Sequence, residues 1–158
     1  MLVSLEDLAA RLPPRGRLMG VDLGTKTIGL ALSDVERRLA TPFDTIRRTK
    51  LTADTNLLVR HLDAFAVEAV VIGLPLNMDG TEGPRAQSTR SFIRAVAPRV
   101  QRPIVFWDER LSTAAVTRGL IALDVSRAKR AAVVDQMAAA YILDGALARL
   151  AQLARGTP

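Results

Sequence analysis

The sequence contains no cysteine and only one histidine, His61, among its 158 residues. The lack of cysteine excludes disulfides, thiolate catalysis and zinc sites built on sulfur, and a single histidine excludes any mechanism that needs a histidine pair. Long apolar runs are also missing, because no segment approaches the roughly 18 uncharged apolar residues of a membrane span. Glu6, Asp7 and Arg11 interrupt the N-terminal stretch, which therefore does not resemble a signal peptide. We expect a cytoplasmic protein without membrane association.

Lysine is scarce as well: of the 22 Lys and Arg residues, only Lys26, Lys50 and Lys129 are lysine, and 19 are arginine. Against 16 Asp and Glu, these cations give a formal net charge of +6. The planar guanidinium of arginine binds phosphate through two parallel hydrogen bonds, so this balance favours a nucleic-acid partner. A GC-rich genome, which favours arginine codons, is the alternative explanation.

The pattern of apolar residues predicts one α/β domain over 17–154, preceded by an extension with a short helix (1–16) and followed by a short tail (155–158). We predict strands over 17–23, 27–33, 39–47, 69–74 and 103–107, and helices over 4–12, 52–65, 84–97, 112–123 and 127–154. Ser4 followed by Asp7 is typical of a helix cap, and Pro42 indicates an edge strand or a bulge. A hairpin extended by βα units predicts a mixed sheet with helices on both faces.

An acidic residue interrupts the first apolar strand. The run from Leu18 to Gly24 is otherwise apolar, and a carboxylate inside a buried strand is costly unless it is paired or bound to a cation. The residue, Asp22, has a second interpretation as a cap of the adjacent turn, because Asp-x-Gly before a hairpin is common. This segment alone leaves both interpretations open.

Two more acids stand at positions that suit a site. Glu109 follows the strand 103–107 at its carboxyl end, where open α/β sheets bind ligands, although acids also simply end strands at a surface. Asp135 projects away from the polar face of the last helix, among Ala138, Ala139 and Ile142, where small side chains let a helix lie close to a sheet. A buried Asp135 could instead pair with an arginine. Asp144 lies on the polar face, and we expect it to be a solvated charge.

Together these acids predict a metal site. Three converging carboxylates, Asp22, Glu109 and Asp135, repel one another unless a cation neutralises them. Oxygen ligands without cysteine or histidine select hard ions, Mg²⁺ or Mn²⁺. Two such ions about 4 Å apart can activate a water and stabilise the leaving oxygen of a phosphodiester. The sequence therefore predicts a nuclease in which these acids are both catalytic and metal-binding.

Basic and polar residues near the three acids are candidates for nucleic-acid contacts. The loop 75–83 follows a buried strand and precedes a helix that carries several arginines, so it can hold a phosphate through backbone N–H groups. A passive connector is the alternative for this loop, and bulk solvent is the alternative for the side chain in the first hairpin turn. We predict contacts from Lys26, Asn77, Arg85, Arg90 and Arg110.

At these residues the chain closely resembles the YqgF/RuvX family of pre-16S rRNA nucleases and Holliday junction resolvases. The resemblance lies in the segments 20–31, 73–82, 108–113 and 134–143, which read GVDLGTKTIGLA, GLPLNMDGTE, DERLST and VDQMAAAYIL. It extends in order from about residue 17 to residue 150. The resemblance implies a ribonuclease-H-like fold, with Asp22, Glu109 and Asp135 at the catalytic positions. Thr27 departs from the family, which often has arginine there.

The family resemblance leaves the substrate open. We lean towards processing of the 5′ end of pre-16S rRNA, with resolution of four-way DNA junctions as the second candidate. A resolvase makes two symmetric cuts and therefore usually works as a homodimer, whereas an rRNA-trimming enzyme can act as a monomer or on a ribosomal particle.

Two other classes compete with the nuclease interpretation. The segment from Val21 to Thr25, followed by Gly29, also resembles the first phosphate loop of sugar kinases and actin-like ATPases, but those proteins bind ATP between two such domains. A catalytically inactive nucleic-acid-binding module would keep the basic charge and need no metal. The presence of all three acids argues against that module.

Overall fold

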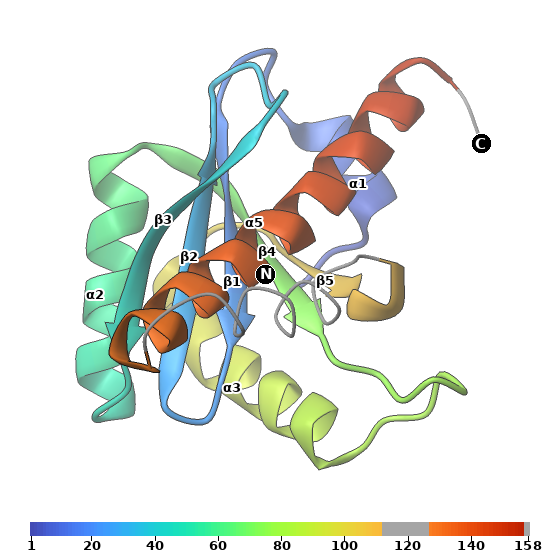
Figure 1. Ribbon diagram of the computed structural model, residues 1–158. Coiled ribbons are helices and arrows are strands. Elements are labelled where there is room, and N and C mark those ends of the chain that lie inside the picture. Colours follow the sequence, from blue (N-terminus) through green and yellow to red (C-terminus); the bar gives the residue numbers. More distant parts are fainter. Residues whose placement is uncertain (112–126, 157–158) are drawn as a thin grey trace.

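The computed structural model describes residues 1–111 and 127–156. Its five strands form one sheet in the order β3-β2-β1-β4-β5 (Figure 1). Their bounds are β1 Arg17–Leu23, β2 Thr27–Ser33, β3 Ala40–Arg47, β4 Val67–Leu74 and β5 Ile104–Asp108. The three strands β1, β2 and β3 pair in antiparallel fashion, whereas β4 runs parallel to both β1 and β5. The predicted mixed sheet is thus confirmed.

Helices cover both faces of this sheet, as the sequence predicts. The helices are α1 Leu5–Arg11, α2 Leu51–Ala64, α3 Pro84–Val100 and α5 Arg127–Ala154, with a short 3₁₀ helix η1 at Glu109–Leu111. The long helix α5 crosses one face and contacts β1, β2, β3 and β4, while α2 and α3 pack on the other face (Figure 1). Two apolar cores result, one on each side. None of the described helices is both long and apolar enough to cross a membrane.

The hairpin and the edge strand follow the sequence pattern closely. Strands β1 and β2 have the predicted bounds. Strand β3 is an edge strand, and its register against β2 shifts between Leu30, which pairs with Asp44, and Ala31, which pairs with Pro42. Pro42 therefore marks both an edge and a bulge. The helix expected over 112–123 lies outside the described residues.

Two predictions about the helices are wrong in detail. Helix α3 continues past Ala97 through Pro98 to Val100, because Pro98 falls in the last turn and the buried Val100 holds that turn against the core. Asp144 is not simply solvated. Its Oδ1 accepts a hydrogen bond of 2.9 Å from the backbone N–H of Ala40, because the first residue of β3 lies beside α5.

The N-terminal helix α1 packs against α5. Ser4 caps it by accepting a hydrogen bond of 3.0 Å from the N–H of Asp7, as expected from the sequence. Leu5 and Leu8 are buried in the core that α5 forms with its face of the sheet. Just before the helix, Leu2 forms an isolated parallel bridge with Ile104, so residues of the extension also pair with the edge strand β5.

Candidate active site

Asp22 lies in the central strand β1, between two glycines of the neighbouring strands. It pairs with Gly29 of β2, and because Val21 pairs with Ile72 of β4, the next residue on that side is Gly73. Residues that are level in a sheet point to the same face. A Cβ atom on either glycine would meet α5, at Asp135 and Ile142 respectively. Asp22 is only 4% exposed, and its side chain therefore also faces α5.

Asp135 of α5 lies directly over Gly29. A Cβ atom at position 29 would be 2.1 Å from the carbonyl oxygen of Asp135 and 2.9 Å from its Cβ, so only glycine allows the helix to come this close. Two residues before Asp22, Gly20 makes the same kind of contact, with 2.6 Å from its ideal Cβ to the carbonyl oxygen of Ala139. The backbone of Asp135 therefore lies against β2, at the residue that pairs with Asp22.

Glu109 lies over the second glycine. It is the first residue of η1, directly after β5, and the residue is 9% exposed. A Cβ atom at position 73 would be 3.0 Å from Cγ and 3.1 Å from Cδ of Glu109. Asp135, Asp22 and Glu109 therefore form a row across three adjacent positions of the sheet, with Asp22 in the middle.

The spacing of this row determines how it can hold metal ions. Adjacent strands are about 4.8 Å apart, so the two outer acids are separated by roughly two strand spacings. Over the described residues, no three His, Cys, Asp or Glu side chains come close enough to share one ion. The donor set nevertheless fits hard divalent cations, because it consists of carboxylate oxygens alone.

Beside the row is a cavity of about 340 Å³, here called the carboxylate cavity. It is lined by Asp22, Gly24, Thr25, Lys26, Thr27, Arg85 and Asp135. Two of the predicted nucleic-acid contacts, Lys26 of the hairpin turn and Arg85 of the first turn of α3, are therefore at the acids. Both side chains are exposed. Each can donate hydrogen bonds to the phosphate of a phosphodiester that lies at the carboxylates.

Thr27 is a site residue that the sequence did not single out. It begins β2, and its hydroxyl donates a hydrogen bond to Oδ2 of Asp135. At the level of sequence, Thr27 is notable only as a departure from the family pattern. The two glycines at positions 29 and 73 were missed in the same way, although a glycine inside an apolar strand is itself a sign of close approach by another backbone or side chain.

The loop 75–83 holds its shape through internal hydrogen bonds. The N–H of Asn77 donates to the carbonyl of Thr81 (2.9 Å), and its side-chain amide donates to the Thr81 hydroxyl (3.0 Å). Arg110 donates to the carbonyl of Met78 (3.2 Å) and to Asp108 (2.7 Å). The guanidinium lowers the pKa of the Asp108 carboxyl, and that carboxylate raises the pKa of Arg110. Asn77 and Arg110 thus shape the loop beside the acids.

Arg90, a further predicted contact, lies on α3 behind this loop. Its Nε donates to Glu82 at 2.7 Å, and its guanidinium carbon lies 4.9 Å from the centre of the Phe106 ring. The pair fastens the end of the loop to α3, and Arg90 is not among the residues that line the carboxylate cavity.

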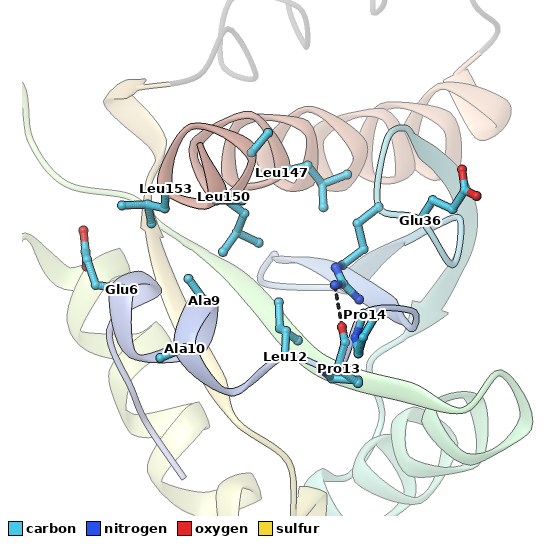
Figure 2. A pocket seen from close by; sticks show the side chains of 13 residues that line it. Glu6, Ala9, Ala10, Leu12, Pro13, Pro14, Glu36, Leu147, Leu150 and Leu153 are labelled. Atoms are coloured by element: carbon cyan, nitrogen blue, oxygen red, sulfur yellow. Dashed lines mark hydrogen bonds between the residues drawn. The ribbon is translucent and has the colours of Figure 1, made fainter. Parts of the chain in front are cut away.

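A larger cavity, of about 610 Å³, lies between α1 and the C-terminal half of α5 (Figure 2). Leu12 and Leu150 point into it, and Glu6 and Glu36 stand at its two ends (Figure 2). Arg37, which also lines it, donates to the carbonyls of Pro13 (2.7 Å) and Gly16 (2.8 Å). This mostly apolar lining contains none of the three acids and does not suit a phosphodiester.

Comparison with known proteins finds a matching family model and several similar relatives. The family model described as "RuvX: Holliday junction resolvase" matches residues 16–149. A protein of Beijerinckia indica named "Putative pre-16S rRNA nuclease" is 64% identical, over 95% of this chain and 91% of that protein. Proteins of the same name from Methylocella silvestris and Sinorhizobium medicae are 60% and 56% identical, over 96% and 98% of this chain and 94% of each relative.

Among solved structures, the chain is similar to RuvC of Thermus thermophilus. The structure described as "T. thermophilus RuvC in complex with Holliday junction substrate" has a TM-score of 0.53 and 17% identity, over 86% of this chain and 96% of that one. RuvC solved alone has a TM-score of 0.50 and 16% identity, over 85% and 96%. At this identity the likeness concerns the fold, which is ribonuclease-H-like.

Proposed function

The chain belongs to the RuvX family, and on that premise we propose that it is a metal-dependent endonuclease that hydrolyses phosphodiester bonds of structured nucleic acid. The proposed process is maturation of the 5′ end of pre-16S rRNA in the cytoplasm, in line with the name of its relatives. We assign the activity to residues 17–154. The observation that carries the proposal is the row of Asp135, Asp22 and Glu109 beside a basic cavity.

In this proposal the three acids hold Mg²⁺ or Mn²⁺, with two ions expected. Such ions lower the pKa of a bound water and stabilise the leaving oxygen of a phosphodiester. Asp22 in the middle of the row, with Asp135 and Glu109 on its two sides, would supply the carboxylate ligands. Thr27 holds the carboxylate of Asp135 in a defined orientation, and binding of ions would draw the three carboxylates towards one another.

The basic residues bind and orient the substrate. Lys26 and Arg85 line the cavity that contains Asp22 and Asp135, so each is placed to donate to a phosphate that reaches those acids. Asn77, Arg90 and Arg110 are proposed to act through the loop 75–83, whose shape they maintain. A net charge of +6 raises the local concentration of a polyanion around this site.

Resolution of four-way DNA junctions is the second candidate, because the family description names Holliday junction resolvases. It would require a homodimer that makes two symmetric cuts. The two candidates share the same carboxylate chemistry and differ in substrate and assembly. Family membership disfavours the sugar-kinase interpretation, and an inactive binding module would leave the row of acids without a role.

A cleavage assay with Mn²⁺ on two matched substrates tests the proposal: the 5′ leader of a 16S precursor and a four-way DNA junction. We expect the wild type to cut the leader and Asp22→Asn to cut neither substrate while keeping the melting temperature. Asp7→Asn, which changes an exposed acid of α1, is the control and should cut normally. If Asp22→Asn cuts at the normal rate, Asp22 is wrongly assigned. If the wild type cuts neither substrate, the nuclease proposal is wrong.

A further inference from the structure

We propose that a second cavity, adjoining the carboxylate cavity, binds the phosphate next to the one that is cut, and that Arg48 is the side chain that binds it. The proposal rests on the proposed nuclease function. The second cavity has a volume of about 220 Å³. It is lined by Leu23, Gly24, Thr25, Arg48, Pro84, Arg85, Ser88 and Thr89.

The two cavities adjoin at the end of β1. They share Gly24, Thr25 and Arg85. Asp22 faces α5, whereas Leu23, the next residue, packs in the core on the α3 face, as alternation along a strand requires. A strand of nucleic acid whose phosphate lies at Asp22 can therefore continue past the hairpin turn into the second cavity, with Arg85 beside both positions.

Arg48 is held at the second cavity before any ligand binds. Its backbone N–H donates to the carbonyl of Lys26 (2.9 Å), and its Nη1 donates to the carbonyl of Gly24 (2.7 Å). The guanidinium carbon also lies 5.7 Å from the centre of the Phe92 ring on α3. Because both ends of the side chain are fixed, little conformational entropy remains to be lost when its other N–H groups bind an anion.

Among the described residues, no ion pair involves this guanidinium. In the part of the chain that the structure describes, Arg15, Arg38, Arg90, Arg102 and Arg110 form ion pairs with carboxylates. Arg48 and Arg85 are in none of these pairs, and both line the second cavity. A half-buried cation with free donors next to a proposed phosphodiester site favours a second phosphate as the ligand.

Substrates with one uncharged methylphosphonate linkage test the proposal directly. Affinity is measured by fluorescence anisotropy in Ca²⁺, with the linkage placed in turn at each phosphate around the cut. We expect the wild type to lose on the order of tenfold in affinity when a phosphate adjacent to the cut is neutralised. Arg48→Gln should bind the unmodified substrate more weakly by a similar factor, and should show no further loss at that phosphate. Unchanged sensitivity in Arg48→Gln overturns the proposal.

A second pair of variants leaves Arg48 and the hairpin turn untouched. Ser88→Glu adds a negative charge to the lining of the second cavity, whereas Ala95→Glu adds the same charge about 10 Å farther along α3. Both positions are exposed. We expect severalfold weaker binding for Ser88→Glu and wild-type affinity for Ala95→Glu. Equal affinities for the two variants would contradict the subsite. Since binding is measured without cleavage, failure of the nuclease proposal is seen separately, as absence of cutting by the wild type in Mn²⁺.

Discussion

Replacing Gly29 with alanine would place a methyl group in the contact between β2 and α5. The new Cβ would lie 2.1 Å from the carbonyl oxygen of Asp135, and ordinary contact begins at about 3.4 Å. The clash is with backbone, which cannot rotate away as a side-chain end can. The helix must therefore retreat by about 1.3 Å at Asp135, the difference between these two distances.

This retreat has two separate effects. Overpacking of a core contact costs about 1–3 kcal/mol, which for a domain of this size lowers the melting temperature by roughly 2–12 °C, at about 2–4 °C per kcal/mol. The carboxylate of Asp135 also moves away from Asp22. A displacement of about 1 Å in a catalytic constellation costs on the order of 100-fold in rate, so Gly29→Ala should be folded and nearly inactive.

The assay measures thermal unfolding and the single-turnover cleavage rate in Mn²⁺, well below both melting temperatures. Leu150→Ala is the matched control, because it removes a buried side chain from the same helix at a cost of about 2–5 kcal/mol. Residue 150 lies about 22 Å along the axis from Asp135, so its rate should stay close to that of the wild type. A wild-type rate in Gly29→Ala, or equally slow cleavage in both variants, would refute the reasoning.

Three further predictions concern other parts of the molecule. Thr27→Val removes the hydroxyl that donates to Asp135, so the Mn²⁺ concentration needed for half-maximal cleavage should rise severalfold; no change would contradict the positioning role. Because Arg110 lowers the pKa of Asp108 below its ordinary 3.8, this pair stabilises the fold above that value and ceases to do so as the pH falls through the lowered pKa. Urea unfolding of Asp108→Asn should accordingly show a weaker loss of stability on acidification than the wild type. Leu8→Ala, in the fully buried face of α1, should cost about 2–5 kcal/mol without changing the cleavage rate measured below its melting temperature.

The sequence was sufficient for the parts of the fold that depend on periodicity. The apolar runs with turn residues between them located β1 and β2 to the residue, since alternation and glycine-rich turns are local signals. The mixed sheet follows from the order of these elements. The end of α3 could not be located in this way, because burial of Val100 outweighs the local effect of Pro98.

For the candidate site, the sequence indicated the three acids but not the residues that hold and surround them. Asp22 was conspicuous as a charge in an apolar strand, and Asp135 as a charge among alanines. The partners of these acids are tertiary: Thr27 reaches Asp135 from 108 positions away. Arg48 looks like any surface arginine until the fold brings it back to Gly24. Asp144 was misjudged for the same reason, because its partner, the N–H of Ala40, is supplied by another element.

The close contact of α5 with glycines of the sheet limits how the three carboxylates can move when an ion binds. At Gly20 and Gly29 the helix carbonyls already lie where a methyl group would otherwise be. The helix therefore cannot move closer to the sheet. Carboxylate oxygens can reach a cation only by turning about side-chain bonds. Glu109, with one more methylene than an aspartate, has the longest such reach in the row. In Glu109→Asp the carboxylate would end one methylene short of the ion, and the backbone could not move to compensate.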